Sequence, residues 1–340
     1  MIAIMKLDPM KPQLIKRDIH RAFYKYRYVK FIHPSDHRAL WLRFTMLSSG
    51  NGFKRIAETW AIFYQRFPNR EVKKLAVKQT YDIHCARETN PSTIRIGDCE
   101  LSANHTRGLI QSKGNSIQWD LDLITGHESS YDFFPEILTR LGIVRNSATT
   151  LCEDLLVSGT SQINGETYVW KQAPGTQGYF HGTKNGHSWV WGHCNTFLDE
   201  KGKQTQFIFD GLSVRTRIGP MIAPKFSSFY FYYQGKSYFF NTLKDHLYLR
   251  SKNTLNTWEF RADRNDLSFR GFVKAEHKDF AGLTYEDTNG SLLYCSNTKL
   301  SDMRVLIYRN GKLEATFDAQ GTATFEIVSR DRNPYVPMLA

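Results

Sequence analysis

Residues 178–197 read GYFHGTKNGHSWVWGHCNTF, and this stretch carries the strongest structural signal in the chain. Its glycine-rich first half predicts a turn, whereas the second half, from His187 to Phe197, predicts a β-strand. Because alternate residues of a strand share a face, large hydrogen-bonding side chains gather on one face of this strand. These side chains are His187, Trp189, Trp191, His193 and Asn195. The opposite face carries small side chains that can pack closely against neighbouring structure.

Two indoles, two imidazoles and an amide are costly to bury without hydrogen-bond partners. This face therefore suits the wall of a ligand cavity, with Trp189, Trp191 and Asn195 as ligand-binding residues. His187 and His193 are candidate catalytic groups, although a single strand histidine also serves as an ordinary structural hydrogen-bonding group. The two imidazoles lie six residues apart, roughly 20 Å along a strand, which is too far to share one metal ion. We expect no metal site.

Two apolar runs upstream of this stretch predict a hairpin with a long loop. ALWLRFTML at 39–47 and IAETWAIFY at 56–64 flank the sequence SSGNG at 48–52. More short strand-like segments follow at 76–84, 93–96, 99–104, 107–112 and 116–123. Closely spaced strands with few helical patterns indicate a barrel or a sandwich.

Downstream of this region the strand-like pattern is interrupted. Residues 133–142, FFPEILTRLG, predict one short helix that ends at Gly142, within a linker at 126–150. A new strand series begins at 155–163, where Asn164-Gly165 predicts a type I′ hairpin turn. Similar turn signals recur at 234–235, 289–290 and 310–311. We predict a basic arm at 1–30, a first β domain at 31–150 that ends in the linker, and a second β domain at 151–340.

The composition favours a folded protein. Hydrophobic residues make up 41% of the 340 residues and aromatic residues 14%. No apolar run reaches the roughly 18 residues of a membrane-spanning helix, and the N-terminus lacks the apolar region of a signal peptide. Five scattered cysteines without a CxxC pair indicate buried thiols rather than disulfides or a zinc site. These features predict a cytoplasmic protein.

The formal net charge of +12 draws attention to the N-terminal segment. Lysine and arginine are densest between Lys11 and Lys30, where they alternate with Tyr24, Tyr26 and Tyr28. A solvated segment with one stripe packed on the first domain accounts for this pattern. The alternative is a weak association of the arm with a membrane surface. No nucleic-acid-binding motif accompanies the charge, so we expect no nucleic-acid partner.

The segment GHSWVWGHCNTF resembles a signature shared by carotenoid 1,2-hydratases (hydroxyneurosporene synthases), AttH-like proteins and tocopherol cyclase-like proteins. Two further stretches are similar in character: RALWLRFTML with AETWAIFY, and LTYEDTNGSLLYCSNTKLSD at 283–302. The resemblance implies a mainly β protein with two lipocalin-like antiparallel β-barrel domains in tandem. It also implies an apolar, often isoprenoid, substrate and the hydration or cyclisation of an alkene.

Such chemistry begins with the transfer of a proton to a carbon atom. The proton donor must be an acidic side chain within an apolar strand. Glu58 is one candidate, because it shares a strand face with Trp60, and Arg43 lies on the partner strand. A buried Glu58–Arg43 ion pair is the alternative, and it would keep Glu58 ionised. Glu286, beside Tyr285, is the second candidate, although the turn at 287–290 could leave it at a rim. Arg43, Trp60 and Tyr285 join the predicted ligand-binding residues.

Indole faces stabilise a carbocation through cation–π attraction, a role that fits Trp189 and Trp191. The sequence therefore predicts a hydratase, cyclase or isomerase of an isoprenoid or polyketide-like alkene, with no cofactor. A non-enzymatic carrier of a lipophilic ligand is the alternative. A third hypothesis is an interaction protein that uses its basic arm at a membrane face. No phosphate-binding loop, nucleophile elbow or HExxH motif is present.

Overall fold

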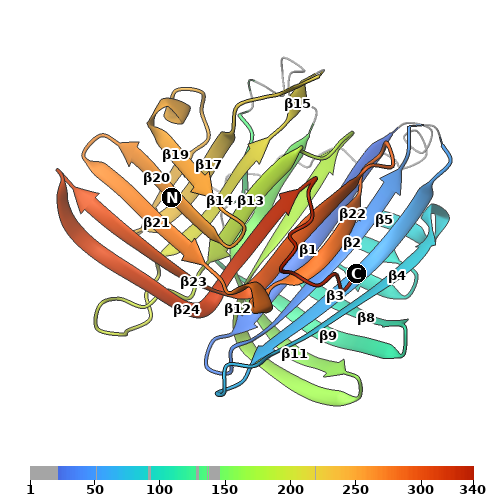
Figure 1. Cartoon of the computed structure of the whole chain (residues 1–340). Helices are drawn as coiled ribbons and strands as arrows, with labels where there is room; N and C mark the ends of the chain where they lie inside the picture. Colours follow the sequence, from blue (N-terminus) through green and yellow to red (C-terminus); the bar gives the residue numbers. More distant parts are fainter. Residues whose placement is uncertain are drawn as a thin grey trace, which may run out of the picture.

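A computed structural model describes residues 22–340, except 51, 91–92, 128–129, 136, 138–145 and 219. In the described chain the regular structure is almost entirely antiparallel β, arranged in two large sheets (Figure 1). The mainly β fold class predicted from the sequence is thereby confirmed. Three short 3₁₀ turns accompany the strands: η2 (Ile83–Cys85), η3 (Asp245–Tyr248) and η4 (His277–Asp279).

The first sheet contains twelve strands and runs in the order β4-β3-β2-β1-β12-β11-β9-β8-β7-β6-β5, with β10 paired to β11. The strands are β1 (Phe23–His33), β2 (Arg38–Ser48), β3 (Arg55–Arg66), β4 (Val72–Asp82), β5 (Ala86–Asn90), β6 (Thr93–Ile96), β7 (Cys99–Leu101), β8 (His105–Ser112), β9 (Asn115–His127), β10 (Tyr131–Asp132), β11 (Ser147–Ile163) and β12 (Glu166–Gly182). The sheet curls until β8 approaches β4, where the Gln111 amide donates to Gln79 Oε1 at 3.2 Å. Buried side chains such as Phe44, Trp119 and Trp170 fill its interior.

The second sheet contains ten strands in the order β18-β17-β14-β13-β24-β23-β21-β20-β19, with β22 paired to β23. Its strands are β13 (Ser188–Cys194), β14 (Ile208–Arg215), β17 (Phe226–Tyr233), β18 (Lys236–Phe240), β19 (Leu249–Asn253), β20 (Thr257–Arg264), β21 (Leu267–Lys274), β22 (Ala281–Glu286), β23 (Leu292–Arg309) and β24 (Lys312–Ser329). A small hairpin, β15 (Arg217–Ile218) and β16 (Met221–Ile222), stands apart from it. This sheet also curls, since Arg264 on β20 donates to the Phe239 carbonyl of β18 at 2.6 Å. Stacked rings such as Phe209 and Phe260, 4.2 Å apart, fill its interior.

The two barrels lie beside each other (Figure 1) and pack through a third apolar cluster. On β2, Leu40 and Leu42 point into the first barrel, whereas Trp41 on the opposite face joins the cluster between the barrels. Strand alternation explains this, because a strand that is apolar on both faces serves two cores. The first barrel contributes residues including Trp60 and Ile62, and the second contributes residues including Leu283, Tyr285 and Val328.

Several predicted strands and turns are confirmed. The predicted hairpin is β2–β3, in which Leu42 lies opposite Ala61. At Asn164-Gly165 both residues have positive φ, 52° and 86°, as a type I′ turn requires. The predicted helix at 133–142 lies mostly outside the described residues. Within the part of the chain that the structure describes, no helix has the length and apolar character needed to cross a bilayer.

The sheets divide the chain at different places from the predicted domains. The first sheet does not end at residue 150 but continues through β11 and β12 to Gly182. The predicted arm at 1–30 overlaps β1, which is an internal strand between β2 and β12. The high charge of this segment concealed the strand. Tyr26 and Tyr28 face the space between the barrels, while Lys25 faces the interior of the first barrel, where it forms an ion pair with Glu88. Residues 1–21 of the predicted arm lie outside the described residues.

Candidate functional site

An aromatic cavity lies between the two barrels. Its lining residues are Tyr26, Tyr28, Trp41, Arg43, Phe133, Ala148, Thr149, Tyr179, Trp189, Trp191, Leu212 and Glu326. The cavity has a volume of about 60 Å³, which is the space of about two water molecules. A larger ligand must therefore move aromatic side chains apart as it enters. Of these described lining residues, Glu326 alone carries a carboxyl group.

Strand β13 forms one wall of this cavity. In β13, Trp189 and Trp191 face the first barrel and line the cavity, while Val190 and Cys194 point into the core of the second barrel. Gly192 also belongs to the small face, where a Cβ would lie 3.1 Å from Trp258. The alternation predicted from the sequence thus matches the structure for the residues inside β13. His187 and Asn195 lie just outside the strand ends.

Arg43 enters the cavity from β2 between two aromatic rings. Its guanidinium carbon lies 3.9 Å from the centre of the Tyr26 ring and 4.3 Å from that of Tyr285. Arg43 Nη2 also donates a hydrogen bond to the Tyr24 hydroxyl at 2.6 Å. These contacts hold a buried cation at the edge of the apolar space, where cation–π attraction offsets part of its lost hydration.

The predicted Glu58–Arg43 ion pair is wrong. The strand register places Trp60 opposite Arg43 and Thr45 opposite Glu58, so the two charged groups do not meet. Glu58 instead lies 3.6 Å from Lys78 Nζ and accepts a hydrogen bond from Trp60 Nε1 at 3.1 Å. It does not line the cavity.

Glu326 on β24 is held by two N–H donors. Trp189 Nε1 donates to Oε1 at 3.1 Å, and Asn297 Nδ2 donates to Oε2 at 2.7 Å. Behind Asn297, the buried Lys299 donates from Nζ to Asn297 Oδ1 at 2.8 Å. Burial lowers the pKa of Lys299 to about 7, against the opposing effect of Glu326, and the nearby charge of Lys30 lowers it further. A titratable network therefore supports the cavity carboxyl.

Asp210 on β14 is a second acid, fully buried behind the cavity wall. It accepts hydrogen bonds from Tyr131 at 2.7 Å, Thr150 at 2.6 Å and Trp191 Nε1 at 2.9 Å. Burial raises the pKa of Asp210 to about 6, although these three donors oppose the shift. Asp210 thus fixes the orientation of the Trp191 indole that faces the cavity.

Sequence reasoning missed both Glu326 and Asp210. Each is a lone carboxylate in an apolar strand, in ATFEIV at 323–328 and in FIFDGL at 207–212. A charged residue in such a run is rarely buried without a purpose, so this pattern was the signal that could have found them.

The two predicted histidines lie in different environments. His193 is completely buried, and its Nε2–H donates to the Glu153 carbonyl at 2.8 Å. Burial, together with the charge of Lys30, holds the pKa of His193 well below its usual range, so the ring is neutral. His187 lies outside β13 and does not line the cavity, and burial lowers its pKa as well.

The remaining predicted residues divide between the cavity and its surroundings. Arg43, Trp189 and Trp191 line the cavity, and Tyr285 packs directly behind it, with its ring stacked 6.4 Å from Trp189. Trp60 lies 5.9 Å from Tyr285 in the same cluster. Glu286 forms an ion pair with Lys54 and does not line the cavity. Asn195 donates to Asp154 Oδ1 at 3.0 Å and to the Gly175 carbonyl at 3.1 Å.

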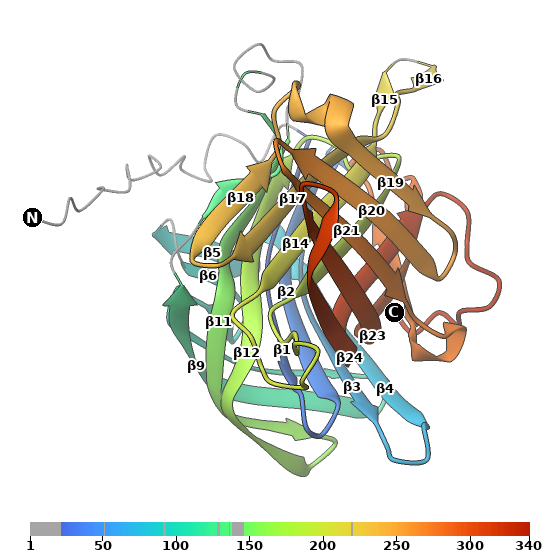
Figure 2. The same ribbon diagram turned by 90° about the vertical axis from the view of Figure 1, so that its left-hand side faces the viewer.

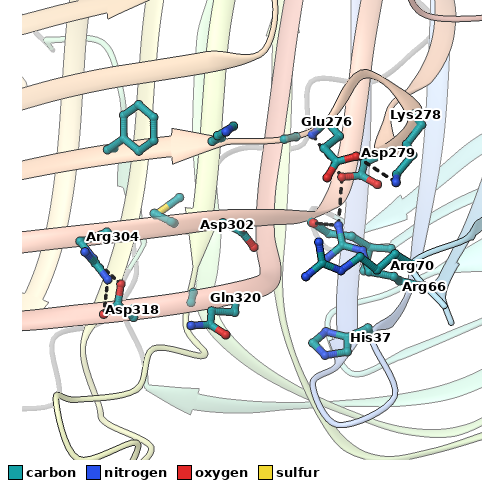
Figure 3. Close-up of a pocket in the computed structure, with 16 residues that line it drawn as sticks. His37, Arg66, Arg70, Glu276, Lys278, Asp279, Asp302, Arg304, Asp318 and Gln320 are labelled. Atoms are coloured by element: carbon teal, nitrogen blue, oxygen red, sulfur yellow. Dashed lines mark hydrogen bonds and ion pairs between the residues drawn. The ribbon is translucent and has the colours of Figure 1, made fainter. Parts of the chain in front are cut away.

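A larger hollow of about 590 Å³ lies elsewhere along the junction of the barrels, and its character is polar (Figure 3). Arg66 of the first barrel crosses this junction and donates to Asp279 Oδ2 at 3.0 Å and to the Leu300 carbonyl at 2.6 Å. Arg304 pairs with Asp318 at 2.6 Å. Such a charged lining suits water and ions rather than an apolar ligand. Among the described residues, no group of three histidine, cysteine or acidic side chains is placed to hold a metal ion.

Together, the fold and the site define a protein of two antiparallel β-barrels with an aromatic cavity between them. The sequence profile of the tocopherol cyclase-like family matches residues 141–327, more than half of the chain, and the chain belongs to that family. Among curated protein sequences, none matches it.

Two solved structures have a similar arrangement. Kievitone hydratase from Nectria haematococca is 10% identical, with a TM-score of 0.53, over 90% of this chain and 88% of the hydratase. A protein assigned as AttH from Nitrosomonas europaea is 11% identical, with a TM-score of 0.48, over 91% of this chain and 92% of that one. At this level of identity the hydratase supports the fold alone.

Proposed function

We propose that the protein binds an apolar alkene, of isoprenoid or polyketide-like type, between its two barrels and catalyses a proton-initiated reaction of that alkene. The reaction would be a hydration, a cyclisation or an isomerisation. The observation that carries the proposal is a carboxyl group, Glu326, in a cavity walled by Trp189, Trp191, Trp41 and Tyr28. Membership of the tocopherol cyclase-like family supports the same class of chemistry, and a hydratase is among the proteins with a similar fold.

Glu326 is the proposed proton donor, because geometry takes precedence over pKa in choosing an acid and this carboxyl reaches the cavity. The proton forms a C–H bond with one alkene carbon, leaving a carbocation on the other carbon and a carboxylate on Glu326. The faces of Trp191 and Tyr28 stabilise the cation. Water then adds and loses a proton, a substrate hydroxyl closes a ring and loses its proton, a second alkene closes a ring whose new cation loses a proton, or a neighbouring proton leaves directly. Each route returns a proton to Glu326, so atoms and charge balance.

Other buried groups would position this machinery without contacting the substrate. Asp210 orients the Trp191 indole, and Asn297 with Lys299 holds the Glu326 carboxyl. A change in such a residue alters the geometry of the site rather than its chemistry. We therefore expect a smaller effect on turnover than that of Glu326.

The test measures deuterium incorporation. The protein is incubated in D₂O with apolar alkenes, including a lipid extract of the cells that produce it, and products are screened for a new C–D bond. We expect Glu326→Gln to lower the rate of deuterium incorporation by roughly 10²–10⁴-fold, the usual contribution of a positioned general acid to catalysis. Glu276→Gln, in the polar hollow, is the matched control and should leave the rate unchanged. Full activity of a folded Glu326→Gln protein would refute the assignment.

One observation favours the second candidate, a non-enzymatic carrier of a lipophilic ligand. Both oxygens of Glu326 accept N–H donors from the protein, Trp189 Nε1 and Asn297 Nδ2, so this carboxyl also has a structural role in holding the cavity wall. A carrier would release its ligand chemically unchanged and would incorporate no deuterium. The same experiment therefore separates the two functions.

A further inference from the structure

Exposed apolar side chains gather at one end of the second barrel. The β15–β16 hairpin presents Met221, which is 70% exposed, and Ile222. The neighbouring segment that contains η3 presents Leu247, which is 69% exposed, together with Leu243 and Tyr248. Both segments project from the same end of the molecule in two perpendicular views (Figures 1 and 2). A soluble surface seldom places this many large apolar side chains at neighbouring loop tips.

The two segments are held together at their bases. The ring of Phe226, which follows the hairpin, stacks on His246 of η3 at 5.3 Å. Lys225 Nζ donates to Asn253 Oδ1 at 2.8 Å, joining the hairpin to β19. The apolar tips therefore form one surface, here called the basic apolar tip. It comprises Met221, Ile222, Leu243, Leu247 and Tyr248, together with the cations described next.

The charges within the two segments are nearly all positive, and Glu259 of β20 lies opposite Lys252. The exposed cations are Arg215, Arg217, Lys244, Arg250 and Lys252. Residues 215–225 contain no acidic residue, and 241–255 contain only Asp245, whose charge is matched by Arg264 at 2.9 Å. Apolar side chains surrounded by cations are complementary to an anionic bilayer, which receives the former at its headgroup level and attracts the latter.

The basic apolar tip also lies close to the aromatic cavity. Leu212 and Trp189 line the cavity, and β14 leads from Leu212 directly to Arg215, which pairs with Ser188 beside Trp189. From Leu212 to Arg217 the chain covers only about 17 Å at the usual strand rise. A ligand that left a bilayer at the tip would therefore meet the cavity wall within one strand length.

We propose that the basic apolar tip docks on an anionic lipid bilayer, from which the protein takes up its apolar ligand. The uptake of a ligand rests on the proposed function, whereas the docking itself does not. Met221 and Leu247 enter the headgroup region, and Arg217 and Lys244 contact lipid phosphates. Docking by these residues is independent of any contact made by residues 1–21.

The test is sedimentation of the full-length protein with vesicles. Vesicles of phosphatidylcholine alone are compared with vesicles that also contain phosphatidylglycerol. We expect binding to the anionic vesicles that weakens with added salt. Arg217→Gln with Lys244→Gln should reduce the partition constant about tenfold or more. Each cation near an anionic surface strengthens binding about fivefold, and this variant removes two. Met221→Ser with Leu247→Ser should also reduce it, on the same vesicles.

The matched control is Lys312→Gln with Leu313→Ser, which removes an exposed cation and an exposed apolar side chain from the β23–β24 hairpin. This control should bind vesicles like the parent. Absence of binding to anionic vesicles, or equal binding by the parent and both tip variants, would overturn the proposal. Turnover of a detergent-dispersed substrate is measured in parallel. Reduced vesicle binding with unchanged turnover supports the docking surface, while turnover changes alone bear only on the proposed function.

Discussion

At the scale of single residues, the junction of the barrels is unusual because titratable groups are buried among aromatic rings. Asp210, Glu326 and Lys299 each lie within this junction, and each has a hydrogen-bond partner there. Burial favours the neutral forms of Asp210 and Lys299, so their partners must stabilise any charge that these two groups retain. Stability should therefore depend on pH in ways that single substitutions can reveal.

Asp210 gives the first prediction. Its pKa is raised to about 6 in the folded protein, so the native state binds a proton more tightly than the unfolded chain. The stabilisation is fully present below the unfolded pKa and is lost as the pH rises through about 6, a loss of about 3 kcal/mol. Urea unfolding across this range should show that slope in the parent and a flatter one in Asp210→Asn. An identical slope in both would show that Asp210 is not protonated in the fold.

Lys299 gives a prediction of opposite sign. Burial lowers its pKa to about 7, so the unfolded chain binds more protons above that pH. Stability should therefore rise with pH above about 7 by up to roughly 1.4 kcal/mol for each pH unit from this group. Lys299→Met should remove that part of the rise, as measured by urea unfolding near neutral pH and about two units higher. The interpretation fails if the variant keeps the full rise.

At the scale of elements, the register shift in β11 between Val157 and Gly159 depends on one glycine. Gly159 has a φ of 135°, and a Cβ there would lie 2.3 Å from the Asp120 carbonyl oxygen of β9. Gly159→Ala should therefore destabilise the protein by about 3 kcal/mol or more, because it adds a backbone clash to an unfavourable φ. Gly165→Ala, in the turn after β11, should cost only about 1 kcal/mol, since nothing lies within 4 Å of that position. Equal losses of stability in chemical denaturation would contradict this account of the register shift.

The elements also show what the sequence could predict. Alternation placed Trp189 and Trp191 on one face of a strand, and the residues of β13 follow that pattern. Local patterns do not encode which strands pair across the molecule. The predicted Arg43–Glu58 ion pair failed because the register of β2 with β3 does not place these two residues together. Strand β1 was not predicted because lysines and arginines alternate with its tyrosines. Asp210 and Glu326 acquire their partners from other strands, and no spacing in the sequence reveals those contacts.

At the scale of the whole molecule, the two barrels are joined by a shared apolar core and not only by a linker. Trp60 is buried in this shared core against Tyr285, and Arg66 reaches across to Asp279. We expect one cooperative unfolding transition for both barrels, and a loss of about 3–5 kcal/mol on Trp60→Ala. Calorimetry with circular dichroism checks both points. Two separate transitions, with only one of them shifted by Trp60→Ala, would show that the barrels fold independently.

The central claim is that an apolar molecule binds between the barrels and not inside either one. Mass spectrometry of an organic extract of the natively purified protein tests this most directly. We predict that a lipophilic molecule is recovered at near-stoichiometric amount from the parent and from Trp119→Phe, a change inside the first barrel, and is lost from Trp191→Ala. Recovery from Trp191→Ala together with loss from Trp119→Phe would place the ligand inside the first barrel and contradict the account.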